Sequence, residues 1–73
     1  MSWKSEVYLI VKQVCPIGEM FSLYDVYKYK DQLQSLYPHN NHIEDKIRQT
    51  LQYLRDDGII TFSDNNGEYK RIK

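Results

Sequence analysis

Apolar residues recur at helical spacing near the start of the chain. Five of them fall on one stripe of a 3.6-residue helix, which predicts a helix over about 3–14. Ser2 is a suitable N-cap, and Pro16 and Gly18 end the segment. The stripe consists of Trp3, Val7, Ile10, Val11 and Val14.

A second helical pattern follows a short extended piece at Met20 and Phe21. Ser22 and Asp25 have the spacing of an N-terminal capping box, so a helix is expected over about 23–37. Pro38 and the polar residues after it end this helix and leave a short connection to the next one. Connections of this length are common between the helices of a helix-turn-helix.

The third helical pattern, over about 41–57, is the clearest in the chain. Its apolar residues lie within about a 100° stripe, and Asn40 or Asn41 is expected to cap its start. Gly58 is well placed to end it. The stripe contains Ile43, Ile47, Leu51 and Leu54, with Thr50 beside them.

The period then changes to alternation, which predicts a hairpin over about 59–72. Ile59 to Ser63 and Glu68 to Ile72 form its strands, and the segment Asp64–Gly67 contains a favourable Asn-Gly pair for the turn. The pattern therefore predicts one α+β domain over residues 1–73, a winged helix-turn-helix. It has three helices, a short strand after the first helix and a C-terminal β-hairpin wing.

Length and composition place function on the surface of this domain. A chain of 73 residues buries only about 60% of its unfolded surface, which leaves little core for a deep catalytic cleft. The single cysteine, Cys15, excludes an intrachain disulfide and fits a reducing compartment. Apolar runs are far shorter than the roughly 18–20 residues of a membrane span, and no signal peptide is recognised, so a cytoplasmic protein is expected. No cofactor is expected.

The charge balance is unusual for a nucleic-acid-binding protein. Ten Lys and Arg residues balance ten Asp and Glu residues, and the charges are not segregated along the chain. Dedicated nucleic-acid binders usually carry a basic excess. Composition alone leaves a binding module, a protein-interaction domain and an orphan fragment about equally open.

Specific strings in the chain resemble a known family. They include the run from Phe21 to Tyr27, the string Lys46-Ile-Arg-Gln, and Leu51-Gln-x-Leu-Arg-Asp-x-Gly58. From about residue 6 to residue 72 the chain resembles the C-terminal winged-helix domain of the Dam-replacing, or DpnI-like, restriction endonucleases. These enzymes act in bacterial restriction-modification systems. The resemblance implies double-stranded DNA binding with the third helix in the major groove. It further implies a preference for N6-methyladenine in a GATC-like site, and a separate nuclease domain upstream.

The polar side of the third helix offers side chains suited to base edges. Arg suits guanine O6 and N7, and Gln or Asn suits adenine N6 and N7. Asp45 can either pair with neighbouring cations or accept a hydrogen bond from cytosine N4. The candidate DNA-binding residues here are Asn41, His42, Asp45, Lys46, Arg48, Gln49 and Gln52.

The hairpin turn is a second candidate DNA contact. Asn65 and Asn66 at its tip and Lys70 on the return strand can meet phosphates, although an ordinary hairpin turn explains the same residues. Asp64 and Glu68 oppose strong phosphate attraction.

Catalytic and metal-binding roles are not expected. The string Glu44-Asp-Lys46 matches part of a nuclease motif, but it falls within a helix. His39, His42 and Cys15 do not form a tetrahedral metal site. The leading hypothesis is a monomeric, non-catalytic DNA-binding module without membrane contact. The alternative is a winged helix used for protein contact or dimerisation.

Overall fold

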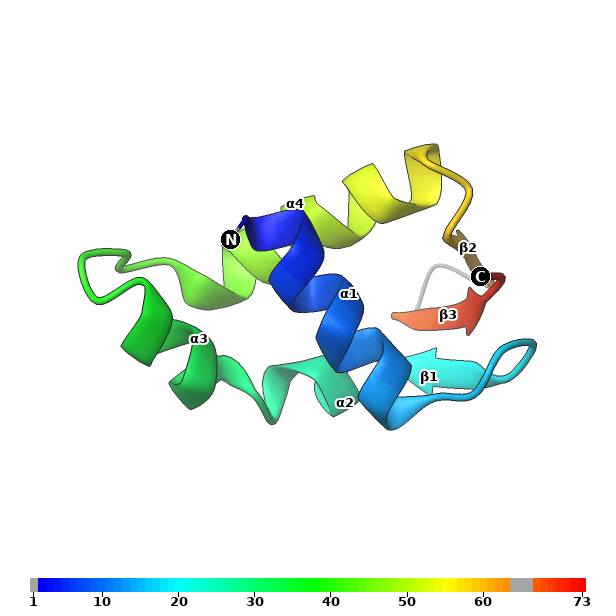
Figure 1. Cartoon of the computed structure of the whole chain (residues 1–73), viewed down its shortest axis with the longest axis horizontal. Helices are drawn as coiled ribbons and strands as arrows, with labels where there is room; N and C mark the ends of the chain where they lie inside the picture. Colours follow the sequence, from blue (N-terminus) through cyan, green and yellow to red (C-terminus); the bar gives the residue numbers. More distant parts are fainter. Residues whose placement is uncertain (1, 64–66) are drawn as a thin grey trace.

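Helices and a small sheet share one core in the computed structural model, which describes residues 2–63 and 67–73. Within these residues there are four helices and three strands (Figure 1). The elements are α1 (Trp3–Val14), β1 (Met20–Ser22), α2 (Leu23–Tyr27), α3 (Lys30–Leu36), α4 (Ile43–Asp56), β2 (Ile60–Phe62) and β3 (Glu68–Arg71). The α+β class and the winged-helix order of elements are confirmed.

Capping boxes start two of the helices. The Ser2 hydroxyl accepts a hydrogen bond from the Ser5 amide at 3.1 Å, and the Ser5 hydroxyl accepts one from the Ser2 amide. At α2 the Ser22 hydroxyl accepts from the Asp25 amide, while the Asp25 carboxylate accepts from the Ser22 amide at 2.9 Å. Each box satisfies two amides that a helix start leaves without an intrahelical partner. The sequence therefore specifies where α1 and α2 begin.

The single helix expected over 23–37 is two helices, α2 and α3. The Tyr29 amide donates to the Val26 carbonyl at 3.0 Å, a three-residue step that tightens the chain between them. Regular bonding resumes with the Leu33 amide, which donates to the Tyr29 carbonyl. A straight helix of this length would extend roughly 22 Å and diverge from a partner that it crosses. The bend lets both α2 and α3 pack against α4.

The start of α4 differs slightly from the expectation, whereas its end follows it. His42 occupies the N-cap position and makes no side-chain cap, while the Asn40 side chain accepts a 2.7 Å bond from the His42 amide. This hydrogen bond from a backbone amide to the side chain two residues earlier forms a turn that directs the backbone into the helix. At the other end, Gly58 has a φ of 77° and ends α4 as expected.

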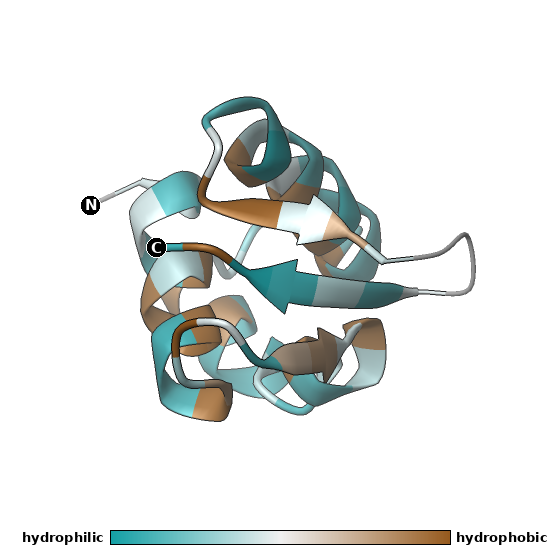
Figure 2. Ribbon diagram, turned by 90° about the vertical axis from the view of Figure 1, so that its right-hand side faces the viewer, coloured by the Kyte–Doolittle hydropathy of each residue, from teal (hydrophilic) through white to brown (hydrophobic). Residues whose placement is uncertain are grey.

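The sheet joins the segment after α1 to the C-terminal hairpin. Its strand order is β1-β3-β2, and both pairings are antiparallel. Phe21 and Phe62 lie opposite Tyr69, one on each side, so these three rings form a row across the strands. Figure 2 shows the three strands at the front, with most of the helical part behind them.

The core lies between α1, α4 and the inner side of the sheet. α1 packs against α4, and each predicted apolar stripe supplies buried residues. Trp3 closes one end by stacking on Tyr37 with ring centroids 4.3 Å apart. The buried apolar residues are Val7, Ile10, Val11, Cys15, Phe21, Val26, Leu33, Ile43, Ile47, Leu51, Leu54, Ile60 and Tyr69. This core holds α4 with its opposite side in solvent.

Candidate nucleic-acid interface

One side of α4 is fixed in the core, and this determines which side chains face outward. Ile47 and Leu51 are 0% exposed, and Thr50 is buried beside them with its hydroxyl bonded to the Lys46 carbonyl. Four polar residues on the opposite side are exposed and together line an open hollow of about 320 Å³. We call them the polar face of α4: Asp45, Arg48, Gln49 and Gln52.

The remaining residues predicted on this helix lie around its first turn. Asn41 and His42 are exposed, and Lys46 is half-buried with its ammonium 3.0 Å from the Gln49 side-chain oxygen. All seven residues predicted on or beside the third helix therefore lie together on one end and one side of α4. Their contact with DNA remains a prediction.

The wing residues lie elsewhere. Lys70 is exposed and lies opposite Met20 and Thr61 in the sheet. Because successive side chains alternate across a strand, Lys70 points to the other side of the sheet from Tyr69. The structure does not bring Lys70 to the polar face of α4. Asn65 and Asn66 lie outside the described residues.

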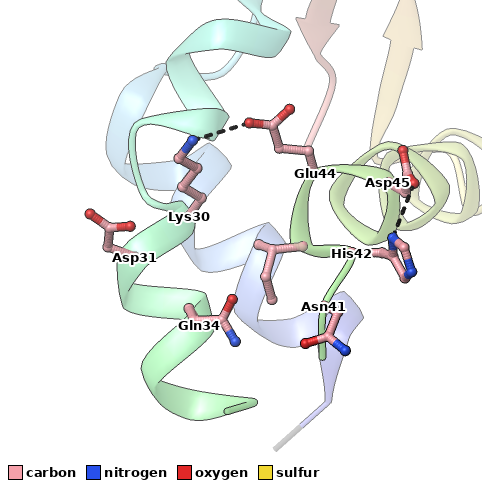
Figure 3. A pocket seen from close by; sticks show the side chains of 8 residues that line it. Lys30, Asp31, Gln34, Asn41, His42, Glu44 and Asp45 are labelled. Carbon is pink, nitrogen blue, oxygen red and sulfur yellow. Dashed lines mark hydrogen bonds and ion pairs between the residues drawn. The ribbon is translucent and has the colours of Figure 1, made fainter. Parts of the chain in front are cut away.

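A second hollow, of about 400 Å³, lies between α3 and the start of α4 (Figure 3). Lys30 reaches across from α3 and places its ammonium 3.2 Å from the Glu44 carboxylate. The His42 imidazole nitrogen Nδ1 lies 3.9 Å from the Asp45 carboxylate. Asp45 also lines the hollow on the polar face. The negatively charged Asp45 side chain therefore lies between the two hollows, on the surface that is expected to approach the DNA phosphates.

The charge of Arg48 on the polar face influences two phenols, that of Tyr27 on α2 and that of Tyr69 on β3. Burial raises the pKa of the Tyr27 and Tyr69 phenols, and the positive charge of Arg48 opposes this rise in both pKa values. The guanidinium of Arg48 therefore acts on a phenol from α2 and on a phenol from β3. No pattern in the sequence indicates that the charge of Arg48 would influence a phenol from α2 and a phenol from β3.

Lys30 was missed by the sequence reasoning. It occupies an exposed position of α3, and its partner Glu44 lies 14 residues away in the sequence. Only the packing of α3 against α4 brings the two charges together. The long-range pair links the two helices beside the candidate interface.

Other candidate chemistry has no support in the parts of the chain that the structure describes. No group of three His, Cys, Asp or Glu residues there is arranged to hold a metal ion. Cys15 is 1% exposed, and burial is the largest cause of its raised thiol pKa, so its thiolate is disfavoured. Among residues 2–63 and 67–73, no helix has the length and apolar character needed to cross a membrane.

The order of elements and the exposed polar side of α4 define a winged helix-turn-helix domain. In this class α4 occupies the place of the recognition helix, and β2 and β3 form the wing. Residues 1–71 match the family model described as the Dam-replacing HTH domain, and the chain belongs to this family. Membership indicates a DNA-binding domain and agrees with the resemblance recognised in the sequence.

Proposed function

We propose that this chain is a non-catalytic module that binds double-stranded DNA by inserting α4 into the major groove. It reads N6-methyladenine in a GATC-like site and serves as the specificity domain of a methyl-directed restriction endonuclease. Membership of the Dam-replacing HTH family supports DNA as the partner. The observation that carries the proposal is the gathering of Asp45, Arg48, Gln49 and Gln52 around one hollow on the exposed side of α4.

The chemistry of the polar face suits the bases of such a site. The Arg48 guanidinium can donate two hydrogen bonds to guanine, and the Gln49 and Gln52 amides match the donor and acceptor of adenine. The Asp45 carboxylate can accept from cytosine N4. A well-formed bidentate contact contributes about 1–3 kcal/mol of discrimination against a wrong base. Selectivity therefore comes from a few base contacts on two turns of helix.

The balanced charge limits affinity without excluding DNA. Binding gains from counterion release in proportion to the phosphates that the protein neutralises, with a salt slope of about −0.9 per phosphate. The chain has no net positive charge, and Lys30 is already paired with Glu44. We therefore expect weak, selective binding with a shallow dependence on salt.

Fluorescence polarisation with unmethylated, hemimethylated and fully methylated GATC duplexes tests the proposal. Fully methylated DNA should bind most tightly, and the affinity should fall only modestly as salt increases. Equal affinity for all three duplexes would refute the proposal that the domain recognises N6-methyladenine. A complete lack of binding at low salt would refute the proposal that DNA is the partner.

Substitutions on the polar face test which side of the domain reads DNA. Arg48→Ala and Gln49→Ala should each lower the affinity for the preferred duplex by roughly 5- to 150-fold, which corresponds to about 1–3 kcal/mol. Gln13→Ala is the matched control, since Gln13 is an exposed glutamine on α1. Unchanged binding by both polar-face variants, with the fold intact, would show that another surface contacts DNA.

A protein-contact role is the second candidate function. Tyr24 is 71% exposed and Tyr53 is 45% exposed, and tyrosine is enriched at protein interfaces. Light scattering over a range of concentrations distinguishes the two functions. A stable dimer that lacks salt-dependent affinity for DNA would favour the protein-contact role.

A further inference from the structure

A row of aromatic rings connects the sheet to the last turn of α4. Phe21, Tyr69 and Phe62 lie opposite one another on the three strands. The centroids of Phe21 and Tyr69 are 5.3 Å apart, and those of Tyr69 and Phe62 are 5.0 Å apart. Exposure rises along the row, from 2% at Phe21 through 7% at Tyr69 to 36% at Phe62. The inner rings thus hold Phe62 in place at the surface.

Arg55 completes this row from the helix side. Its guanidinium carbon lies 4.5 Å from the centre of the Phe62 ring, and 41% of its side chain remains exposed. Nε and Nη2 lie 3.3 Å from one carboxylate oxygen of Asp56. A guanidinium that lies parallel over an aromatic ring keeps its N–H groups in its own plane above the ring, where they can still reach an oxyanion from the side. The stack therefore fixes the side chain while leaving its donors at the surface.

The position of Arg55 extends the candidate interface toward the wing. Arg48 and Arg55 are seven residues apart on α4, so they lie on nearly the same side, roughly 10 Å apart along the axis. Arg48 belongs to the polar face, whereas Arg55 sits where α4 meets β2. In the homeodomain, a three-helix variant of the helix-turn-helix, the C-terminal end of the recognition helix contacts the DNA backbone, and Arg55 lies at the corresponding end of α4.

We propose that Arg55, held against Phe62, is a phosphate-binding residue at this junction and contacts a phosphodiester of the bound DNA. The inference rests on the proposed DNA-binding function and adds a backbone contact to the base-reading polar face. Phe62 is a positioning residue that acts through Arg55. Asp56 shares the guanidinium in the free protein and competes with the phosphate for it.

Salt dependence distinguishes a phosphate contact from base reading. Arg55→Gln should weaken binding to all duplexes by a similar factor, whatever their sequence or methylation, and should make the salt slope less steep by about one unit. Arg55→Lys should keep the salt slope but lose part of the affinity, because an ammonium lacks the planar stack. Lys12→Gln is the matched control, since Lys12 also lies over an aromatic ring, at 4.5 Å from the centre of Tyr8 on α1.

Phe62→Leu tests positioning while retaining an apolar residue at the edge of the sheet. It should weaken binding in the chain that has Arg55 and have no further effect in the Arg55→Gln chain. Thermal unfolding monitors the fold of each variant. Additive effects of the two substitutions would overturn the positioning role of Phe62.

The remaining outcomes separate the two proposals. If the unaltered chain fails to bind any duplex at low salt, the proposed DNA-binding function fails. If it binds but Arg55→Gln leaves both affinity and salt slope unchanged, the phosphate contact alone is refuted. A loss confined to one sequence or methylation state would also overturn the phosphate assignment, because it would make Arg55 a base-reading residue.

Discussion

The end of α4 depends on one left-handed residue, Gly58, and this dependence can be measured. The Gly58 amide donates to the Arg55 carbonyl and the Ile59 amide donates to the Leu54 carbonyl, both at 3.0 Å. With a φ of 77° at Gly58, these two bonds form a Schellman motif. The motif turns the chain from α4 into β2, so it also sets the position of Arg55 relative to Phe62.

Replacing Gly58 with L-alanine isolates the cost of this backbone conformation. A Cβ built at Gly58 meets no heavy atom within 4 Å, so no clash adds to the cost. The left-handed conformation costs an L-residue about 1–2 kcal/mol. For a domain of this size each 1 kcal/mol lowers the midpoint of thermal unfolding by about 4–8 °C. Gly58→Ala should therefore lower the midpoint, by about 4–8 °C for each 1 kcal/mol of net destabilisation.

D-alanine at the same position provides the matched comparison. It carries the same methyl group but favours positive φ, and it reduces the freedom of the unfolded chain, an effect of about 0.4–1 kcal/mol for compatible sites. A chain of 73 residues is accessible to chemical synthesis. Circular dichroism of the glycine, L-alanine and D-alanine chains should rank D-alanine as equal to or more stable than glycine, with L-alanine lowest. Equal midpoints for the two alanine chains would refute the conformational explanation.

Three further predictions concern the core and the phenols of Tyr27, which is partly buried, and Tyr69, which is buried. Leu51→Ala removes a side chain that is 0% exposed and should lower the free energy of unfolding by about 2–5 kcal/mol in urea denaturation, whereas a loss below about 1 kcal/mol would contradict close packing there. Because burial raises the pKa of Tyr27 and Tyr69, the folded state holds these protons more tightly than the unfolded state. Their contribution to stability should be complete below pH about 10 and decline as pH rises through the folded pKa values, and Arg48→Gln should move the ultraviolet titration of tyrosinate to higher pH.

Local sequence signals specify the starts and ends of several elements. Ser22 and Asp25 form the predicted capping box because both partners lie within one turn of helix. α4 was predictable because its buried side requires apolar residues at a fixed period, and Gly58 because a left-handed helix end favours glycine. These features are encoded within a few residues of where they occur.

Features that depend on packing were not predictable from the same signals. The tightened turn at Tyr29 contains no proline or glycine, and it lets α2 and α3 both follow α4. The Lys30–Glu44 pair and the stack of Arg55 on Phe62 each join residues from different elements. The polar face itself was predicted from its period, whereas the cations and rings beside it required the fold.

The paired charges around α4 give the balanced composition a physical meaning. Lys30 lies beside Glu44, and Arg55 lies beside Asp56. Such exposed ion pairs contribute little to folding stability, so DNA can displace a carboxylate at modest cost. Each displaced carboxylate nevertheless remains near the duplex and repels its phosphates, which offsets part of the gain from each cation. This repulsion weakens nonspecific binding more than it weakens binding to a preferred site, because base contacts at the preferred site offset the repulsion. Affinity therefore depends more on the base sequence in the groove than on the charge of the DNA backbone.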